Sequence, residues 1–229
     1  MTSESFTKSQ IDKLGERLRK GSPSDSDLVL LDRFRRSYSA GYERVIAIIR
    51  DRLGFQPTGR PAKSTSAIVE KLKRESIRLS QVQDIAGCRF IVAAASEQGA
   101  ALDVLLRELP GASLDDRRGR PSHGYRAVHV IAIADGKPIE IQVRTALQHS
   151  WAELSEKYAD VIDPAIKYGG GPELVRTLLT RFSDYIADVE DIELQVSEDD
   201  LVDVEPLKQE IRGLLQMAVD AASSSQGAT

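Results

Sequence analysis

Disulfide-forming cysteines, long apolar runs and a dominant sign of charge are all missing from this sequence. A single cysteine, Cys88, excludes an intramolecular disulfide. There is no charged-then-apolar leader and no apolar run longer than 128–134, so we expect a cytoplasmic protein that does not span a membrane. The net charge of −4 argues against a uniformly basic nucleic-acid binder, although basic residues cluster in 60–78 and 117–126 and acidic ones in 184–205.

The composition is that of a folded globular chain. Its 229 residues are enough for one large domain or two small ones with an ample core. Hydrophobic residues at 41% and charged residues at 29% separate it from disordered proteins. No internal repeat is visible, so the elements have to be predicted one by one.

Helices are predicted at both ends of the chain. They are a short charged helix over 4–20, a long helix over 25–53, and two helices over 172–197 and 202–221. Asp25 or Ser26 caps the long helix, and Pro172 suits the first position of the helix over 172–197. Apolar residues recur along the long helices at helical spacing, and these stripes are most simply core.

Strands and helices alternate in the middle of the chain. The predicted order is a loop over 54–61, a basic helix over 67–78, a strand over 88–93, a helix over 97–109, strands over 112–115 and 125–133, a strand from Lys137, and a helix over 146–158. We therefore expect a single α/β domain with a mixed sheet, flanked by N- and C-terminal helices. The expected divisions are a helical arm over 1–53, a core over 54–160, C-terminal helices over 161–222 and a disordered tail over 223–229.

The stretch 137–151 carries a polar face that suggests chemistry. Apolar residues alternate there with Glu140, Gln142 and Arg144, so a strand presents a carboxylate, an amide and a guanidinium on one side. Glu140 and Arg144 bring an acceptor of metal or protons near a donor for phosphate, as phosphoryl-transfer sites require. The alternative is a half-buried strand with a solvated polar face.

Two further polar positions fit the same chemistry. Asp84 lies just before a buried strand, and with Glu140 it can hold Mg²⁺, because a phosphate-bound magnesium needs only one or two carboxylates. An Asx turn is the alternative for Asp84. The Tyr125 ring, beside Gly124 and on one strand face with His129, can stack on a flat ligand, and a core tyrosine is equally consistent.

Four groups of residues, in order and in spacing, resemble the synthetase domain of the RelA/SpoT family over about 59–158. They are Lys63-Ser64-Thr65 with Ile68 and Lys-Leu-Lys-Arg at 71–74; Asp-Ile-Ala-Gly-Cys-Arg at 84–89; Gly-Tyr-Arg-Ala-Val-His at 124–129; and Glu-Ile-Gln-Val-Arg-Thr at 140–145 with Trp-Ala-Glu at 151–153. Any one of these is weak evidence, but four in order are highly specific. The family's nucleotidyltransferase-like domain is an ATP-dependent pyrophosphokinase, which transfers the β,γ-pyrophosphate of ATP to a nucleotide 3′-hydroxyl.

The resemblance is to the short, stand-alone members of the family, the small alarmone synthetases. The chain has no His-Asp pair of the kind that the family's hydrolase half uses, and no room for the ribosome-sensing domains. Within this group the resemblance extends to a toxic branch, which pyrophosphorylates the 3′ CCA end of tRNA and stops translation.

The resemblance implies a role for each matching residue. Asp84 would bind Mg²⁺, and Glu140 would bind the metal or activate the attacking 3′-hydroxyl. ATP binding is implied for Arg60, Lys63, Ser66, Lys71, Arg74 and Arg89, with the planar Arg89 guanidinium on the adenine. Acceptor binding is implied for Arg120, Tyr125, His129 and Arg144, with the Tyr125 ring on the base. The transfer asks for charge neutralisation and in-line positioning more than for a covalent nucleophile.

The ATP side follows the family pattern more closely than the acceptor side. The family's arginine two places before the lysine is Pro61 here, with Arg60 one place away, and its phosphate-binding serine falls at Ala67, beside Ser66. The basic residue that usually precedes the Gly-Tyr pair is replaced by Pro-Ser-His at 121–123. The acceptor is therefore the less certain substrate.

Three functions remain open from the sequence. One is synthesis of (p)ppGpp from GDP or GTP, and another is modification of tRNA, whose backbone a loop with Arg117, Arg118 and Arg120 can contact. The third is a nucleotide-binding regulator without catalysis, against which the presence of both Asp84 and Glu140 argues.

A synthetase without a hydrolase half makes a product that it cannot remove. We therefore expect the cell to hold it in check through a neutralising antitoxin protein or a separate hydrolase. The amphipathic helices predicted over 25–53 and 172–197 offer surfaces for such a partner or for a homo-oligomer, although their stripes are also consistent with core.

Overall fold

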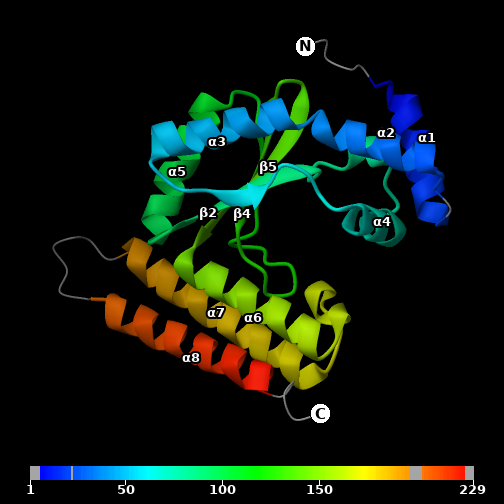
Figure 1. Ribbon diagram of the computed structural model, residues 1–229. Coiled ribbons are helices and arrows are strands. Elements are labelled where there is room, and N and C mark those ends of the chain that lie inside the picture. Colours follow the sequence, from blue (N-terminus) through cyan, green and yellow to red (C-terminus); the bar gives the residue numbers. More distant parts are fainter. Residues whose placement is uncertain (1–5, 22, 196–202, 225–229) are drawn as a thin grey trace. The chain divides into compact units, whose positions relative to one another are not determined.

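The computed structural model describes residues 6–21, 23–195 and 203–224, which fall into two compact units (Figure 1). The first unit draws on Met1–Phe90, Val104–Leu114 and Val130–Gln142, and the second on Ile91–Asp103, Asp115–His129 and Val143–Thr229. Each unit is thus assembled from separated stretches of the chain. None of the described helices is both long enough and apolar enough to cross a membrane.

A five-stranded sheet, in the order β1-β2-β5-β4-β3, lies mainly in the first unit. Its strands are β1 (Thr58–Arg60), β2 (Ala86–Val92), β3 (Ser113–Asp116), β4 (Val128–Ala134) and β5 (Lys137–Thr145). Asp135 and Gly136 join β4 to β5 with φ values of 49° and 72°, as a two-residue hairpin turn requires. The predicted mixed α/β fold with flanking N- and C-terminal helices is confirmed.

The N-terminal region of the first unit also contains helices. They are α1 (Lys8–Lys20), α2 (Asp25–Arg36), α3 (Ser39–Leu53) and α4 (Thr65–Arg74). In Figure 1, α3 runs along the sheet, and a Cβ on Gly41 would stand 2.5 Å from the carbonyl oxygen of Ala134. Only glycine at this position allows α3 to approach β4 so closely.

The single helix predicted over 25–53 is wrong, because the chain turns at Ser37 and Tyr38. The Ser37 hydroxyl donates to the carbonyl of Phe34 at 2.6 Å, and the Ser39 hydroxyl donates to that of Arg36 at 2.8 Å. Serine hydroxyls that bond to the preceding turn compete with helical hydrogen bonds and bend the chain. The apolar stripe continues across this turn, so hydrophobic periodicity does not reveal the turn.

Two other boundaries differ from those predicted. Helix α4 ends at Arg74, so Arg78 lies outside it, before the short 3-10 helix η1 (Leu79–Gln81). Strand β1 lies within the predicted loop over 54–61. It was not predicted because its three residues are all exposed and the central one is glycine, so no alternation of apolar and polar residues is present.

The second unit is built around helices α6 (Ala146–Val161), α7 (Glu173–Gln195) and α8 (Glu205–Ser224), with the 3-10 helix η2 (Pro164–Tyr168) between the first two. Helix α5 (Ala95–Glu108) begins in this unit. Helix α6 packs on η2, α7 and α8 around a core that includes Trp151, Leu179, Ile186 and Leu215.

The C-terminal prediction needs one correction. The last helix begins at Glu205 and continues to Ser224, so Ser223 belongs to it and not to a disordered tail. Val202, the predicted start, and 225–229, the rest of the predicted tail, lie outside the described residues.

Candidate active site

The register of the first two strands gathers two predicted ATP-binding residues in the first unit. Strands β1 and β2 are antiparallel, with Thr58 opposite Arg89 and Arg60 opposite Gly87. Because side chains alternate along a strand, Arg60 and Arg89 project from the same face of the sheet. The opposite face of β2 carries the buried Cys88. The short strand that the sequence did not reveal therefore sets the position of Arg60.

Glu140 lies on the same face. A Cβ on Gly87 would stand 3.3 Å from the Cβ of Glu140 and 2.9 Å from its carbonyl oxygen, so Gly87 permits close approach of β2 to β5. The Gln142 amide donates to Glu140 Oε2 at 2.9 Å. Burial and the Glu140 charge raise the pKa of Cys88 to about 12, so this thiol is unreactive as a nucleophile.

Asp84 is held by two lysines just before β2. Lys63 Nζ lies 2.5 Å from Asp84 Oδ2 and Lys71 Nζ lies 3.0 Å from Oδ1. All three side chains are less than a fifth exposed, and the Lys63 backbone N–H also donates to the Ile85 carbonyl at 2.6 Å. Burial acts to raise the pKa of Asp84, but the hydrogen bonds and charges of Lys63 and Lys71 outweigh it and lower that pKa. The carboxylate is ionised, and the cluster carries a net positive charge.

This donor set fits a magnesium ion that is held partly by phosphate. Among the residues that the structure describes, no cluster of three or more His, Cys, Asp or Glu side chains could hold a metal alone. Magnesium usually takes one or two protein carboxylates, completes its shell with water and substrate phosphates, and neutralises phosphate charge. Asp84, just before β2, and Glu140 of β5 are the carboxylates that would hold it.

Two predicted ATP-binding residues stand apart from this cluster. Ser66 is exposed in the first turn of α4, where its hydroxyl lies 3.2 Å from that of the helix cap Ser64. Arg74 ends the same helix and pairs with Glu75 at 3.0 Å. Both belong to the helix that carries Lys71, and Glu75, the partner of Arg74, also lies 3.9 Å from Lys71 Nζ.

A tight turn in the second unit positions Tyr125. The backbone of Ser122 pairs with that of Tyr125, with N···O distances of 3.2 Å and 2.9 Å, and the two residues between have φ values of 55° at His123 and 87° at Gly124. A Cβ on Gly124 would stand 2.7 Å from the ring of Trp151, so glycine is required there. The prediction that Tyr125 belongs to a strand is wrong, because β4 begins only at Val128.

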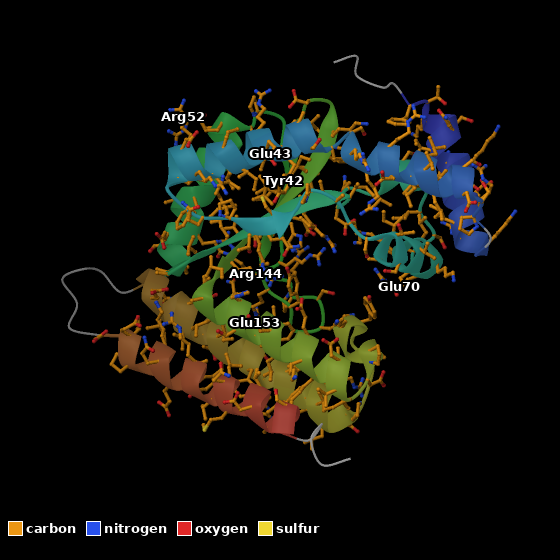
Figure 2. All side chains as sticks on the ribbon, in the orientation of Figure 1. Tyr42, Glu43, Arg52, Glu70, Arg144 and Glu153 are labelled. Atoms are coloured by element: carbon orange, nitrogen blue, oxygen red, sulfur yellow. The ribbon has the colours of Figure 1, made fainter. Side chains whose placement is uncertain are left out.

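Tyr125 contacts two other residues that were predicted to bind the acceptor, His129 and Arg144. Its hydroxyl lies 2.9 Å from His129 Nε2 and accepts a hydrogen bond from Arg144 Nη2 at 3.0 Å. The Arg144 guanidinium carbon lies 5.1 Å from the centre of the Tyr125 ring, within cation–π range. Arg144, labelled in Figure 2, is only 5% exposed, so the solvated polar face predicted for β5 does not extend to it.

The loop before this turn is less basic than its sequence suggests. Arg117 pairs with Asp115 at 2.7 Å and Arg118 pairs with Asp116 at 2.6 Å. The remaining predicted contact, Arg120, is exposed in the same loop. Two of the three guanidinium groups therefore already have carboxylate partners within the loop.

A buried polar network at the junction of β5 and α6 was not predicted. Glu190 of α7 accepts hydrogen bonds from the Thr145 hydroxyl and, at 2.8 Å, from the Gln148 amide. Gln98 of α5 donates to the Val143 carbonyl at 2.9 Å and to Gln148 Oε1 at 3.0 Å. The only sequence signal was Thr145 as a helix cap with Gln148 three residues later.

The first unit thus presents carboxylates and cations, and the second unit presents cation and aromatic side chains. These are the types of side chain that phosphate transfer uses. Residues 59–159 match the family model described as a region found in RelA / SpoT proteins. The predicted resemblance to the RelA/SpoT family is confirmed for this segment.

Individual relatives agree with this assignment. An uncharacterized protein of Mycobacterium tuberculosis is 36% identical over 116 residues, which are 49% of this chain and 42% of that protein. A GTP pyrophosphokinase of Haemophilus influenzae is 33% identical over 101 residues, which are 42% of this chain and 13% of that protein. The chain thus spans less than half the length of each of these curated relatives.

A solved structure shares the fold. The small alarmone synthetase 1 of Bacillus subtilis, bound to its product pppGpp, aligns with a TM-score of 0.58 at 22% identity, over 73% of this chain and 96% of that one. This similarity extends beyond 59–159 and shows that the flanking helices belong to the same architecture.

Proposed function

We propose that this chain is an ATP-dependent pyrophosphokinase, which transfers the β,γ-pyrophosphate of ATP to the 3′-hydroxyl of GDP or GTP and so makes (p)ppGpp. The observation that carries the proposal is the convergence of Lys63 and Lys71 on Asp84, beside the strand pair that presents Glu140. Glu75 lies 3.9 Å from Lys71 and 3.0 Å from Arg74. Lys63, Lys71 and Arg74 therefore outnumber Asp84 and Glu75, and this leaves an excess positive charge, which a polyphosphate would neutralise.

The residues of the first unit would bind the donor. Lys63 and Lys71 exchange part of their interaction with Asp84 for the ATP phosphates, which frees the Asp84 carboxylate for Mg²⁺. Arg60 and Arg89 share a sheet face, and a planar guanidinium stacks well on a purine. These contacts supply charge neutralisation and orientation, which are the main needs of phosphoryl transfer.

Glu140 is the candidate general base. In the proposed step, the acceptor's 3′-oxygen forms a bond to the β-phosphorus of ATP while the bond from that phosphorus to the α,β-bridging oxygen breaks. AMP leaves with the electron pair of that bond, and the 3′-hydroxyl proton passes to Glu140. A carboxylate positioned within hydrogen-bond reach typically contributes about 10²–10⁴-fold to the rate of such a proton transfer.

The residues of the second unit would bind the acceptor. The Tyr125 ring offers a stacking surface for a base, while Arg144 and His129 offer donors to its sugar or phosphates.

The test is transfer of label from γ-labelled ATP in the presence of Mg²⁺ and one acceptor at a time, namely GDP, GTP or deacylated tRNA. We expect labelled (p)ppGpp, one AMP for each product, no transfer after chelation of the metal, and none by Glu140→Gln. The matched control is Glu43→Gln on the exposed surface of α3, which should transfer normally. Label on tRNA alone would assign a different acceptor, and absence of transfer to all three would overturn the proposal.

A further inference from the structure

The second unit contains a cavity that joins the predicted acceptor residues to a segment with no assigned role. The cavity has a volume of about 210 Å³, and Tyr125, Arg144 and Trp151 line it together with Lys167 and Tyr168 of η2. Small-molecule sites usually measure about 300–1,000 Å³, so this cavity would take only part of a ligand, such as a base with its sugar.

The chemistry of the cavity is that of a nucleotide site. Three aromatic side chains, Tyr125, Trp151 and Tyr168, offer flat apolar surfaces. Arg144 and Lys167 supply positive charge from two different elements, β5 and η2, and outnumber the one carboxylate of the lining, Glu156. A nucleotide base stacks on aromatic surfaces, and a phosphate binds to positively charged groups.

Helix η2 is tied to the turn that positions Tyr125. Gly169, which ends η2 with a φ of 77°, packs so closely on His123 that an added Cβ would stand 2.1 Å from its Nδ1 atom. Ile166 anchors the middle of η2 in the core at 4% exposure. The position of η2 is thus coupled to the Ser122–Tyr125 turn and not left to a free loop.

Lys167 and Tyr168 are exposed at the cavity. Lys167 pairs with Asp160 at 3.1 Å, but both side chains are well exposed, and such pairs contribute little and exchange readily. Tyr168 is 52% exposed at the cavity rim. Both residues lie beyond the segment 59–159 that matches the family, so the family pattern does not assign them.

We propose that Lys167 and Tyr168 are acceptor-binding residues, with Lys167 on the acceptor's 5′-phosphates and Tyr168 on its base or sugar beside Tyr125. The proposal rests on the function proposed above. It makes η2 a determinant of acceptor choice in this chain that acts from outside the family motifs.

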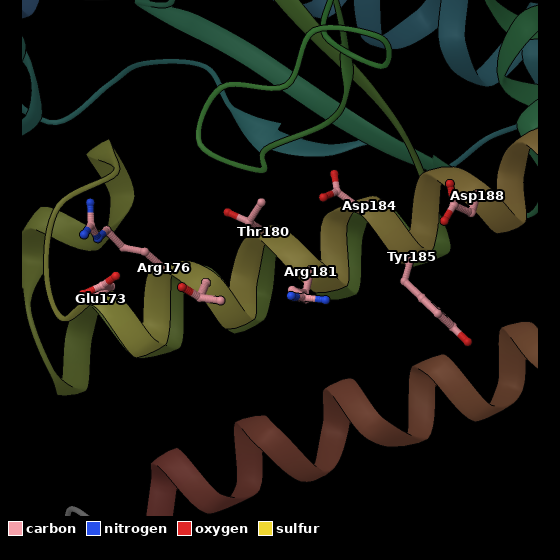
Figure 3. Close-up of a pocket in the computed structure, with 8 residues that line it drawn as sticks. Glu173, Arg176, Thr180, Arg181, Asp184, Tyr185 and Asp188 are labelled. Atoms are coloured by element: carbon pink, nitrogen blue, oxygen red, sulfur yellow. The ribbon is translucent and has the colours of Figure 1, made fainter.

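A second groove in the same unit lacks these features. It lies along α7, has a volume of about 650 Å³, and is lined by both signs of charge, including Asp184, Asp188, Arg176 and Arg181 (Figure 3). With Glu173, its three carboxylates outnumber its two guanidinium groups, so the groove does not favour an anionic nucleotide, whereas the cavity has one carboxylate against two cations. Its exposed Tyr185 therefore serves as a control for Tyr168.

Direct binding can be measured through Trp151, the only tryptophan of the chain. Its indole N–H donates to the Leu179 carbonyl at 2.7 Å, so the ring is fixed in the cavity wall. We expect GDP or GTP to change its fluorescence in a saturable way, and a non-hydrolysable ATP analogue alone to change it much less. The Tyr168→Ala variant should weaken the GDP titration about 5- to 150-fold, the range for loss of one stacked base.

Steady-state kinetics provide the second test. Lys167→Met should raise the acceptor KM about two- to fivefold, as expected for an exposed ionic contact, and leave the ATP KM unchanged. Lys13→Met and Tyr185→Ala, both at exposed positions away from the cavity, should match the wild type. Unchanged acceptor KM and unchanged fluorescence titrations in both η2 variants would overturn this inference while leaving pyrophosphate transfer intact. Wild-type protein that binds GDP but transfers nothing would instead count against the proposed function.

Discussion

At the scale of single residues, Asp84 matters because two cations share it. If the carboxylate is a magnesium ligand, Asp84→Asn removes the charge that compensates the metal while keeping the shape of the side chain. We expect its kcat to fall about 10²–10³-fold, the usual cost of losing one group that stabilises transition-state charge. The exposed Asp51→Asn of α3 is the control, and normal turnover by Asp84→Asn with intact circular dichroism would contradict the assignment.

The same side chain predicts a pH dependence of stability. The pKa of Asp84 is lowered in the folded protein, so the ionised form contributes stability above its unfolded pKa, and this contribution is lost as pH falls through the folded pKa. At pH 7 the wild type should exceed Asp84→Asn by about 1–3 kcal/mol in free energy of unfolding. Urea denaturation at neutral and acid pH checks this, and a difference that stays constant or grows in acid would refute it.

Tyr125 combines a ring and a hydroxyl whose contributions can be separated. Tyr125→Phe removes only the hydrogen bonds to His129 and Arg144, whereas Tyr125→Ala also removes the stacking surface. We expect Tyr125→Ala to raise the acceptor KM by the equivalent of about 1–3 kcal/mol and Tyr125→Phe to have a smaller effect. The ATP KM should stay constant in both. An equal rise in both substrates' KM values would indicate loss of structure and not of acceptor binding.

At the scale of elements, the junction of β5 and α6 depends on α7. Thr145 caps α6, and its hydroxyl is in turn bound by Glu190, which is 8% exposed. Glu190→Ala would leave the buried Thr145 hydroxyl and Gln148 amide without this acceptor, so we expect a loss of about 1–3 kcal/mol in the free energy of unfolding. Glu190→Gln, which keeps one acceptor oxygen, should restore part of it. A Glu190→Ala variant as stable as Glu153→Ala, measured by urea denaturation, would show that the network carries no net stability.

The sequence predicts local patterns better than the contacts that cross them. Alternation in β5 correctly predicts a strand with Ile139 and Ile141 buried, and spacing correctly predicts α6. The burial of Arg144 was missed because its partner Tyr125 lies 19 residues away in a turn that no periodicity reveals. The Asp84 cluster was equally hidden, since Lys63 and Lys71 come from a loop and a helix 21 and 13 residues distant.

The predicted boundaries of helices and strands were wrong where hydrogen bonds from side chains, or the lack of a side chain at glycine, determine the backbone conformation. Ser37 and Ser39 break a helix whose apolar stripe is continuous. Gly59 fits into β1 because it has no Cβ, which would stand 2.5 Å from the Gly87 carbonyl oxygen. From composition alone, a glycine at this position indicates a loop. Neither effect changes the hydrophobic pattern, so neither can be predicted from it.

At the scale of the whole molecule, the proposed substrates fall on different units. The residues assigned to ATP, the metal and the general base belong to the first unit, and Arg120, Tyr125, His129 and Arg144 belong to the second. Strand β5 passes from one to the other between Gln142 and Val143, so a single strand carries both Glu140 and Arg144. Donor and acceptor affinities should therefore respond to different variants, as the kinetic predictions above require.

The proposed reaction also has a consequence for a cell that contains the protein. Transfer without a matching hydrolase consumes ATP and accumulates a product, so induction of the wild-type chain in a heterologous host should arrest growth. The Glu140→Ala variant, expressed to the same level, should not, because the proton acceptor and one metal ligand are gone. Growth curves with nucleotide extraction check both, and co-expression of a neutralising protein or a (p)ppGpp hydrolase should restore growth. A wild type that is active in vitro yet harmless, or a Glu140→Ala variant that is equally toxic, would show that growth arrest does not come from unopposed pyrophosphate transfer.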